Sequence, residues 1–217
     1  MRNLLKKELK LSTSPLAWFF LLFSLMTFLP GYPILMGSFF ICLGQFQSFV
    51  AAREANDILY TVLLPVRKTD VVTAKYTAAG FFELAGLVLM AVFTVIRMTL
   101  LADSPVYTRN ALMNATPVFL AFVLVIFMLF NVIFLGGFFK TAYKIGKPFI
   151  LFIIAAMVVT GIAESLIHIP GLTFLHSPTV EKPAVQYAAL AAAAVLYELA
   201  TGMSKKKSKE RFEQIDL

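Results

Sequence analysis

The sequence has little charge, and its few charged residues are separated by long apolar runs. Of its 217 residues, 14% are charged and 59% are hydrophobic, and the mean hydropathy is +0.83. A chain of this composition would leave large apolar patches in water if it folded around one soluble core. We therefore predict an all-α polytopic membrane protein whose single membrane domain covers residues 1–217 and leaves no room for a soluble domain.

Cysteine, histidine and nucleotide-binding motifs are also scarce or missing. Cys42 is the one cysteine, which excludes an intrachain disulfide and a multi-cysteine metal site. The two histidines lie in a proline-rich loop and are a weak signal for a metal, so we predict no metal site. Neither GxxxxGK[ST] nor GxSxG occurs. We expect no catalytic residue and no cofactor bound by this chain, and any dependence on ATP must come from a partner.

The positions of the cations predict a membrane topology. Sixteen of the 19 Lys and Arg residues fall in four clusters. Cations near span ends stay on the cytoplasmic side, so all four clusters can lie inside only if the apolar stretch between neighbouring clusters crosses the membrane twice. This predicts six transmembrane helices with both termini inside. The clusters are Arg2, Lys6, Lys7 and Lys10; Arg53, Arg67, Lys68 and Lys75; Lys140, Lys144 and Lys147; and Lys205, Lys206, Lys207, Lys209 and Arg211.

The net charge of +7 predicts anionic lipid headgroups as partners. A nucleic-acid site would need a basic face on a folded domain, whereas these cations border apolar segments of membrane length, so we predict no nucleic-acid partner. Residues 2–11 alternate apolar and basic positions, which predicts an amphipathic helix in the membrane interface.

The predicted spans cover residues 14–29, 34–51, 75–101, 116–139, 148–167 and 183–203. Pro30, Gly31 and Pro33 divide the uncharged run of residues 11–52 into a helical hairpin. The apolar part of its first arm, residues 16–29, reaches about 21 Å as an α-helix, against about 30 Å of hydrocarbon. The arm therefore either draws in the preceding residues or enters the membrane and returns, and the charge pattern fits both. Thr69 is the predicted N-cap of the third span, followed by Asp70 at the positive helix end.

The longest inside loop, residues 53–76, is the most informative segment. It predicts a short amphipathic helix, a break at Pro65 and a basic turn leading into the third span. Arg53, Glu54 and Asp57 are expected on one face of that helix, where they could meet a soluble partner. The alternative is a solvated interfacial loop.

This loop resembles the permease subunits of ABC-2-type exporters. The resemblance rests on Asp57-Ile58-Leu59, Leu64-Pro65-Val66-Arg67-Lys68, Val71-Val72 and Lys75-Tyr76, and on the layout of six spans without an ATPase domain. It implies a bacterial cell-membrane permease that pairs with a second copy or a similar permease and binds two copies of a separate ABC ATPase, which holds ATP and Mg. The loop would be the coupling helix that sits in a groove of the ATPase. The residues expected to couple to the ATPase are Arg53, Glu54, Asp57, Pro65, Arg67, Lys68, Asp70 and Lys75.

Among small members of that family, the chain looks most like exporters of amphipathic peptides, of the phenol-soluble-modulin and lantibiotic-immunity types. The implied cargo is therefore an amphipathic or hydrophobic molecule, in particular a peptide. A substrate-capturing membrane component of a vitamin importer is the alternative, although it would need a pocket rich in polar groups. A lipid-modifying enzyme would need clustered catalytic groups at one depth, and the chain has none.

Charged and polar residues inside the spans are further candidates for the translocation path. Glu83 and Glu164 each cost about 2.5 to 3.5 kcal/mol at the bilayer centre, so each should face a partner or water. Arg97 lies at the depth of Glu164, which predicts either an ion-pair lock between helices or two side chains that reach the interface separately. The polar residues Gln45, Gln47 and Asn131 could line the path or join helices by hydrogen bonds.

Overall fold

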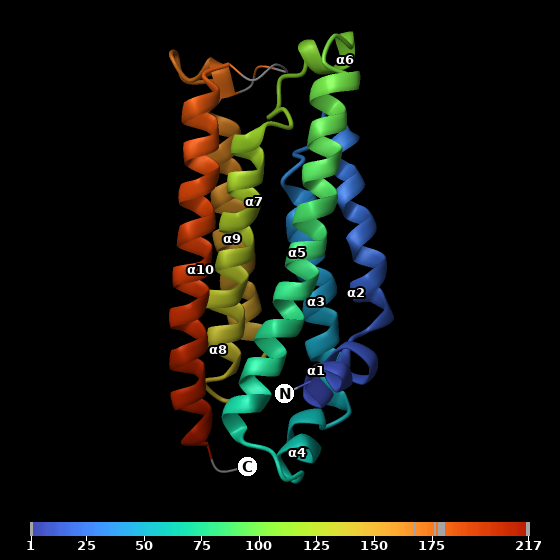
Figure 1. The fold of residues 1–217 in the computed structure, drawn as a ribbon, viewed down its shortest axis with the longest axis vertical. Coiled ribbons are helices and arrows are strands. Elements are labelled where there is room, and N and C mark those ends of the chain that lie inside the picture. Colours follow the sequence, from blue (N-terminus) through green and yellow to red (C-terminus); the bar gives the residue numbers. More distant parts are fainter. Residues whose placement is uncertain (1, 167, 176, 178–180, 216–217) are drawn as a thin grey trace.

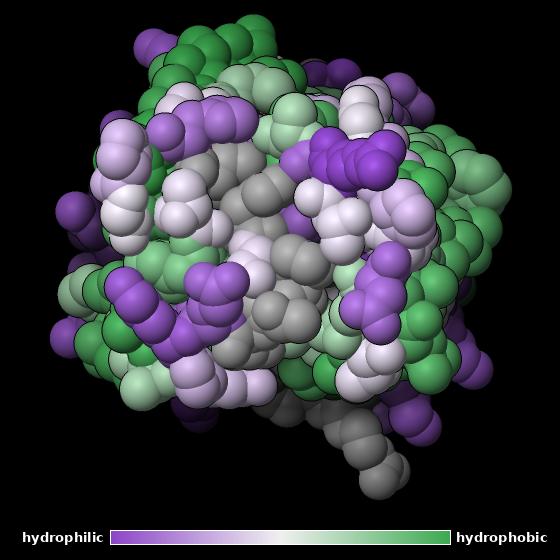
Figure 2. Space-filling view, turned by 90° about the horizontal axis from the view of Figure 1, so that it is seen from above, coloured by the Kyte–Doolittle hydropathy of each residue, from purple (hydrophilic) through white to green (hydrophobic). Residues whose placement is uncertain are grey.

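The computed structural model describes residues 2–166, 168–175, 177 and 181–215, and no β-strand occurs among them. Long helices run roughly side by side, and both chain ends lie at the same end of the bundle as the short helix α4, Asp57–Val62 (Figure 1). The opposite end carries α6, Pro105–Thr108 (Figure 1). Seen from the α6 end, hydrophilic residues spread over this face and hydrophobic residues cover the sides (Figure 2). The arrangement matches the predicted placing of both termini together; which side they face stays a prediction.

The amino-terminal segment bends sharply before the first arm of the hairpin. It consists of α1, Arg2–Lys7, and the π-helix η1, Glu8–Ser12. The first arm then starts with α2, Pro15–Phe20, where Ser14 caps the helix and Pro15 occupies its first position. Residues 3–12 and 15–28 meet at 87°, so the amino-terminal segment lies across the end of the bundle.

The first arm is longer than an α-helix of the same number of residues, because its second part, η2, Leu21–Phe28, is a 3₁₀-helix. A 3₁₀-helix rises about 2.0 Å per residue against about 1.5 Å in an α-helix, so α2 and η2 together extend about 25 Å. Two hydroxyl groups donate to the carbonyl three residues earlier, which matches the three residues per turn of a 3₁₀-helix. Ser24 donates to the Leu21 carbonyl at 2.6 Å, and Thr27 donates to the Ser24 carbonyl at 2.8 Å. A short apolar run thus nearly reaches the thickness of the hydrocarbon.

The second arm of the hairpin, α3, Met36–Glu54, is the central helix of the bundle. It contacts α2, η2, α5, α7 and α9. Phenylalanines fill the space around it; the Phe46 and Phe149 rings, for example, stack with centroids 3.7 Å apart. Because α3 faces protein on most sides, it can carry Gln45 and Ser38 in buried positions without exposing them to lipid.

The third long helix, α5, Lys68–Leu100, begins seven residues before the predicted span of residues 75–101. Asp70 lies in its first turn, as expected. Thr69 is not the N-cap, because α5 starts at Lys68, one residue before Thr69. The N-cap is Arg67, which is extended and forms no side-chain hydrogen bond as a cap. The Thr69 carbonyl instead accepts a hydrogen bond from Thr73 within the helix.

The second half of the chain supplies three more long helical segments. The fourth consists of α7, Pro117–Leu129, the π-helix η3, Phe130–Leu135, and α8, Gly136–Phe138, and starts at the Thr116 N-cap. Helix α9, Gly146–Leu166, follows, and residue 167 of the predicted fifth span lies outside the described residues. After a 3₁₀ turn, η4, Thr173–Leu175, helix α10, Pro183–Glu213, runs the length of the bundle and continues ten residues beyond the predicted end of the sixth span.

Within the described residues, four helices are long and apolar enough to cross a membrane, and the bent amino-terminal pair makes a fifth if it is counted as one span. The four are α5, the combined segment 117–138, α9 and α10. Helix α3 falls outside this set because its buried face carries polar residues. The predicted number of six spans therefore stays a prediction.

Candidate functional site

Four charged side chains form a buried cluster at the end of the bundle that carries both termini. Lys75 on α5 contacts Glu8 on η1 at 2.9 Å and Asp57 on α4 at 3.2 Å. Lys7 on α1 contacts the same two carboxylates, at 3.1 Å for Glu8. We call Lys7, Glu8, Asp57 and Lys75 the coupling cluster. Its two positive and two negative charges balance, which is the condition under which buried charges are tolerated.

The coupling cluster joins segments that are far apart in the sequence. Lys75 is only 4% exposed, and its two ion pairs span 67 and 18 residues of chain. Ser12 donates to Asp57 at 3.2 Å and Lys7 donates to Thr61 at 2.8 Å, so neutral side chains complete the cluster. The amino-terminal segment, α4 and α5 are therefore held together at one point.

Asp57 faces the interior, and this corrects the sequence prediction. Arg53 and Glu54 end α3 and are exposed, but Asn56 adopts a left-handed conformation with φ of 49° and starts a new helix in another direction. The three residues therefore do not share a helix face. Burial alone would raise the pKa of Asp57, but the neighbouring Lys75 and Lys7 ammonium groups outweigh burial and hold its pKa below the ordinary value.

The outward side of α4 is apolar. Tyr60 is 66% exposed and Leu63 is 76% exposed, while the buried side carries Asp57 and Thr61. Pro65 and Arg67 are exposed in the following turn. Lys68 is half-buried and donates to the Ile215 carbonyl at 2.6 Å, and Asp70 is half-buried in α5. Of the predicted coupling residues, Arg53, Glu54, Pro65 and Arg67 are thus accessible, while Asp57 and Lys75 act within the protein.

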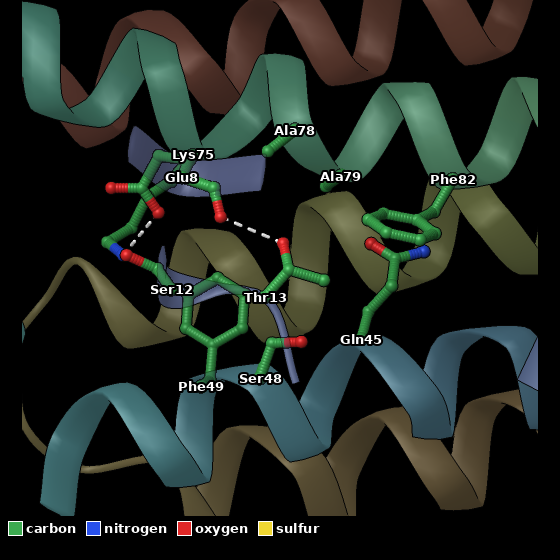
Figure 3. A pocket seen from close by; sticks show the side chains of 10 residues that line it. All are labelled: Glu8, Ser12, Thr13, Gln45, Ser48, Phe49, Lys75, Ala78, Ala79 and Phe82. Carbon is green, nitrogen blue, oxygen red and sulfur yellow. Dashed lines mark hydrogen bonds and ion pairs between the residues drawn. The ribbon is translucent and has the colours of Figure 1, made fainter. Parts of the chain in front are cut away.

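A small cavity of about 30 Å³ adjoins the coupling cluster. Its walls come from η1, α3 and α5, and Figure 3 shows Lys75 and Glu8 at one end and Gln45 with Phe82 at the other. Both polar atoms of the Gln45 side chain are buried without a hydrogen-bond partner among the described residues. Gln47 is half-buried on the same helix. Whether either residue contacts a transported molecule stays a prediction.

A second buried cluster surrounds Glu83 in the middle of α5. The carboxylate is 1% exposed and accepts hydrogen bonds at one oxygen from the Tyr197 hydroxyl at 2.5 Å and from the Asn131 amide at 2.9 Å. The Asn131 amide also donates to Thr201 at 3.3 Å. Within the described residues, Glu83 has no cation as a partner, and its second oxygen has no hydrogen bond. Asn131 therefore joins α5, η3 and α10 by hydrogen bonds, and its place in a translocation path stays a prediction.

The hydrogen bonds continue from Asn131 toward the carboxy-terminal end of α10. The Asn131 carbonyl lies in the π-helical turn and accepts from Ser204 at 3.1 Å and from Tyr76 at 3.3 Å. The Tyr76 hydroxyl also contacts Ser204 at 2.9 Å and Ser208 at 3.0 Å. A π-turn displaces backbone carbonyls from their ordinary helical partners, so side chains can reach them.

We call Glu83, Asn131, Tyr197 and Thr201 the membrane cluster.

Arg97 and Glu164 do not form the predicted ion pair. Arg97 donates to the Thr27 carbonyl at 2.6 Å and to Asn114 at 2.5 Å, and its guanidinium lies 4.0 Å from the centre of the Tyr107 ring. Glu164 accepts from the Met113 backbone at 2.8 Å. Arg97 and Glu164 therefore form hydrogen bonds with the neighbouring loop residues Asn114 and Met113, and not with each other. Arg97 in addition fastens the end of η2 to this loop.

Sequence reasoning missed Glu8 and Tyr197. Glu8 is the one acidic residue before Glu54, and an isolated acid within a basic amphipathic segment is a signal for a specific ion pair. Tyr197 lies among alanines of the sixth span, and only the packing of α10 against α5 reveals its contact with Glu83. No sequence signal identifies that contact.

A comparison with known protein families identifies the family of this chain. A family model described as ABC-2 family transporter protein matches residues 3–207. The chain belongs to this family. It is the permease subunit of an ABC transporter and a multi-pass membrane protein, and a bacterial plasma membrane fits the family. Searches of curated proteins and of solved structures gave no significant match.

Family membership gives the coupling cluster a context. ABC-2 permeases generally work with an ABC ATPase subunit. In this permease the end that carries α4 is the end where all four cation clusters are gathered. That end is therefore the candidate contact with the ATPase.

Proposed function

We propose that this permease forms the translocation path of an ATP-driven exporter of amphipathic cargo, and that α4 is its contact with the ATPase. The observation that carries the proposal is the coupling cluster, which fastens α4 to α5 through Asp57 and Lys75. A force on α4 would be passed directly to a helix that spans the membrane. A solvated interfacial loop would not need a buried, charge-balanced anchor.

The surface of α4 supports a protein partner. Leu59 and Tyr60 on α4 and Leu63 directly after it are exposed. Helix α4 lies at the far end of the bundle, beyond α1 (Figure 1). Exposed apolar residues on a short helix, with charged residues beside them, are typical of a binding site for a protein groove. Arg53 and Glu54 supply the neighbouring charges. The proposed contact is thus more apolar than the sequence suggested.

Two open grooves on the sides of the bundle support an amphipathic or hydrophobic cargo. One, of about 410 Å³, lies between α7, α9 and α10, and the other, of about 420 Å³, lies along η2. Hydrophobic side chains dominate both, including Phe122, Leu196 and Leu25. A vitamin-capturing component would instead need convergent polar groups in its pocket. We extend the proposal to a dimer of permeases that binds two ATPase copies, in which ATP and Mg are held by the ATPase and this chain performs no covalent chemistry.

The test is co-purification of the tagged permease from its native membranes, with mass identification of the bound subunits. We expect an ABC ATPase in stoichiometric amount with the wild-type chain and at least a tenfold loss with Tyr60→Ser/Leu63→Ser. Leu11→Ser is the matched control, because Leu11 is 80% exposed on η1 and lies outside α4. It should retain the ATPase within about twofold.

Two results would contradict the proposal. A permease that purifies alone and carries a small molecule would support the vitamin-capture alternative. An equal loss of the ATPase in the α4 variant and in the Leu11 control would show that apolar exposure in general, and not α4, determines binding.

A further inference from the structure

A groove of about 310 Å³ lies between the carboxy-terminal half of α10 and the segment η3–α8. One wall is a stripe along α10 formed by Ala200, Ser204, Lys207 and Arg211, whose spacing of three or four residues places them on one helix face. The other wall is formed by Val132 and Gly136. Met203 on α10 also lines the apolar part of the groove. The groove therefore runs along the helices.

The chemistry of this groove changes along its length. Val132 and Met203 are 39% and 67% exposed and belong to the apolar part of their helices. Lys207 and Arg211 follow one and two turns further along α10, after that apolar part has ended. Gly136 keeps the floor open, because a Cβ at this position would lie 2.8 Å from the Ser204 hydroxyl. One end of the groove is thus hydrocarbon-like and the other cationic.

The cations of the groove have no acidic partner among the described residues. Arg211 donates one hydrogen bond, to the Gly136 carbonyl at 3.2 Å, which brings its guanidinium to the last turn of the fourth span. Lys207 is exposed and forms no ion pair in this part of the chain. In the coupling cluster, by contrast, each lysine contacts two carboxylates. Lys207 and Arg211 are therefore available for an external anion.

We propose that this groove binds one anionic phospholipid of the cytoplasmic leaflet. Its phosphate lies between Lys207 and Arg211, and one acyl chain lies along Val132, Ala200 and Met203. Cations immediately beyond a span attract anionic headgroups, and a guanidinium can donate two hydrogen bonds to one phosphate. A free phosphate would use only the cationic end, and a soluble protein would not reach the apolar end within the hydrocarbon.

The test is lipid binding to the purified, delipidated full-length permease, measured by native mass spectrometry. The probes are phosphatidylglycerol, phosphatidylcholine and inorganic phosphate as a competitor. We expect phosphatidylglycerol to bind at least tenfold more tightly than phosphatidylcholine and to resist millimolar phosphate. Lys207→Gln/Arg211→Gln should weaken its binding at least tenfold. Lys205→Gln/Lys206→Gln removes the same charge from residues outside the groove and should change it by less than about twofold.

Each of the opposite outcomes overturns the proposal. Equal weakening in both double variants would show diffuse attraction to the basic run, and equal binding of the two lipids would show that the headgroup charge is not recognised. Displacement by phosphate would show a small-anion site. If the double variant with Arg211→Gln has a lower thermal midpoint than the wild-type permease, the single variants Lys207→Gln and Lys206→Gln are compared in place of the double variants. A difference of less than about twofold between these single variants also overturns the proposal.

Discussion

The coupling cluster and the membrane cluster both bury carboxylates against α5, but they satisfy them differently. In the coupling cluster, Glu8 and Asp57 each contact two ammonium groups. In the membrane cluster, the hydrogen bonds that Glu83 receives from the described residues come from the neutral side chains of Tyr197 and Asn131. The first cluster depends on balanced charge, whereas the second depends on the placement of neutral donors.

This difference separates the roles of the two regions. Breaking a buried ion pair leaves the remaining charge without compensation, which is more costly than the loss of one hydrogen bond from a neutral donor. The coupling cluster should therefore behave as a rigid joint at the end of the bundle that carries α4. The membrane cluster should tolerate a neutral residue in place of its carboxylate.

The largest effect is expected for Lys75→Met. Removal of this buried ammonium leaves Glu8 and Asp57 with Lys7 alone, so we expect a loss of about 3 kcal/mol in the free energy of unfolding. Equilibrium unfolding in mixed SDS micelles measures it. The double variant Lys75→Met/Glu8→Gln restores the charge balance and should recover part of the loss. If the double variant is as unstable as the sum of both single changes, the cluster is not held by balanced charge.

Acidification should weaken the coupling cluster next. Because the pKa of Asp57 in the folded protein lies below its ordinary value, its contribution to stability is full above about pH 4 and is lost as the pH falls through the folded pKa. We expect the thermal midpoint of the wild-type permease to fall more between pH 5 and pH 3 than that of Asp57→Asn. Parallel curves for the two proteins would argue against this assignment.

Tyr197→Phe should have a smaller effect, of about 1 kcal/mol. The substitution removes one neutral donor from Glu83 and leaves the Asn131 amide in place. The same unfolding measurement reports it, and Tyr187→Phe is the matched control because Tyr187 is 55% exposed on the same helix. A loss as large as that of Lys75→Met would remove the distinction between the clusters.

The smallest effect is expected for Glu83→Gln, below about 1 kcal/mol. The glutamine oxygen can accept the hydrogen bonds of Tyr197 and Asn131, so both donors keep their partner. No cation is left behind. A large loss of stability with retained expression would mean that the negative charge itself is needed in the membrane cluster.

Much of the helical layout could be predicted from composition, charge and helix breakers. Pro30 and Gly31 mark the hairpin turn, and Thr116 and Pro117 mark the start of the fourth segment, because their backbone preferences act locally. The 3₁₀ winding of η2 and the π-turn at Asn131 could not be predicted. Both depend on contacts with other helices, which a pattern along one segment does not contain.

The sites were predictable only where one segment determines the geometry. Arg53 and Glu54 are exposed, but they end α3, and the left-handed Asn56 turns Asp57 inward, so the predicted shared helix face does not form. For Arg97 the sequence allows an ion pair with Glu164 or a side chain that reaches the interface, yet the residue donates to a backbone carbonyl and to Asn114. A charged residue in a span thus indicates that a partner exists without indicating which one.

The contacts of α5 also join parts of the permease that are synthesised at different times. Glu8 is made 67 residues before Lys75, so the ion pair between them cannot form until the start of α5 has been made. Lys68, at the same end of α5, donates to the Ile215 carbonyl, which is synthesised 147 residues later. The contacts at the start of this helix are therefore completed only after residue 215 has been made.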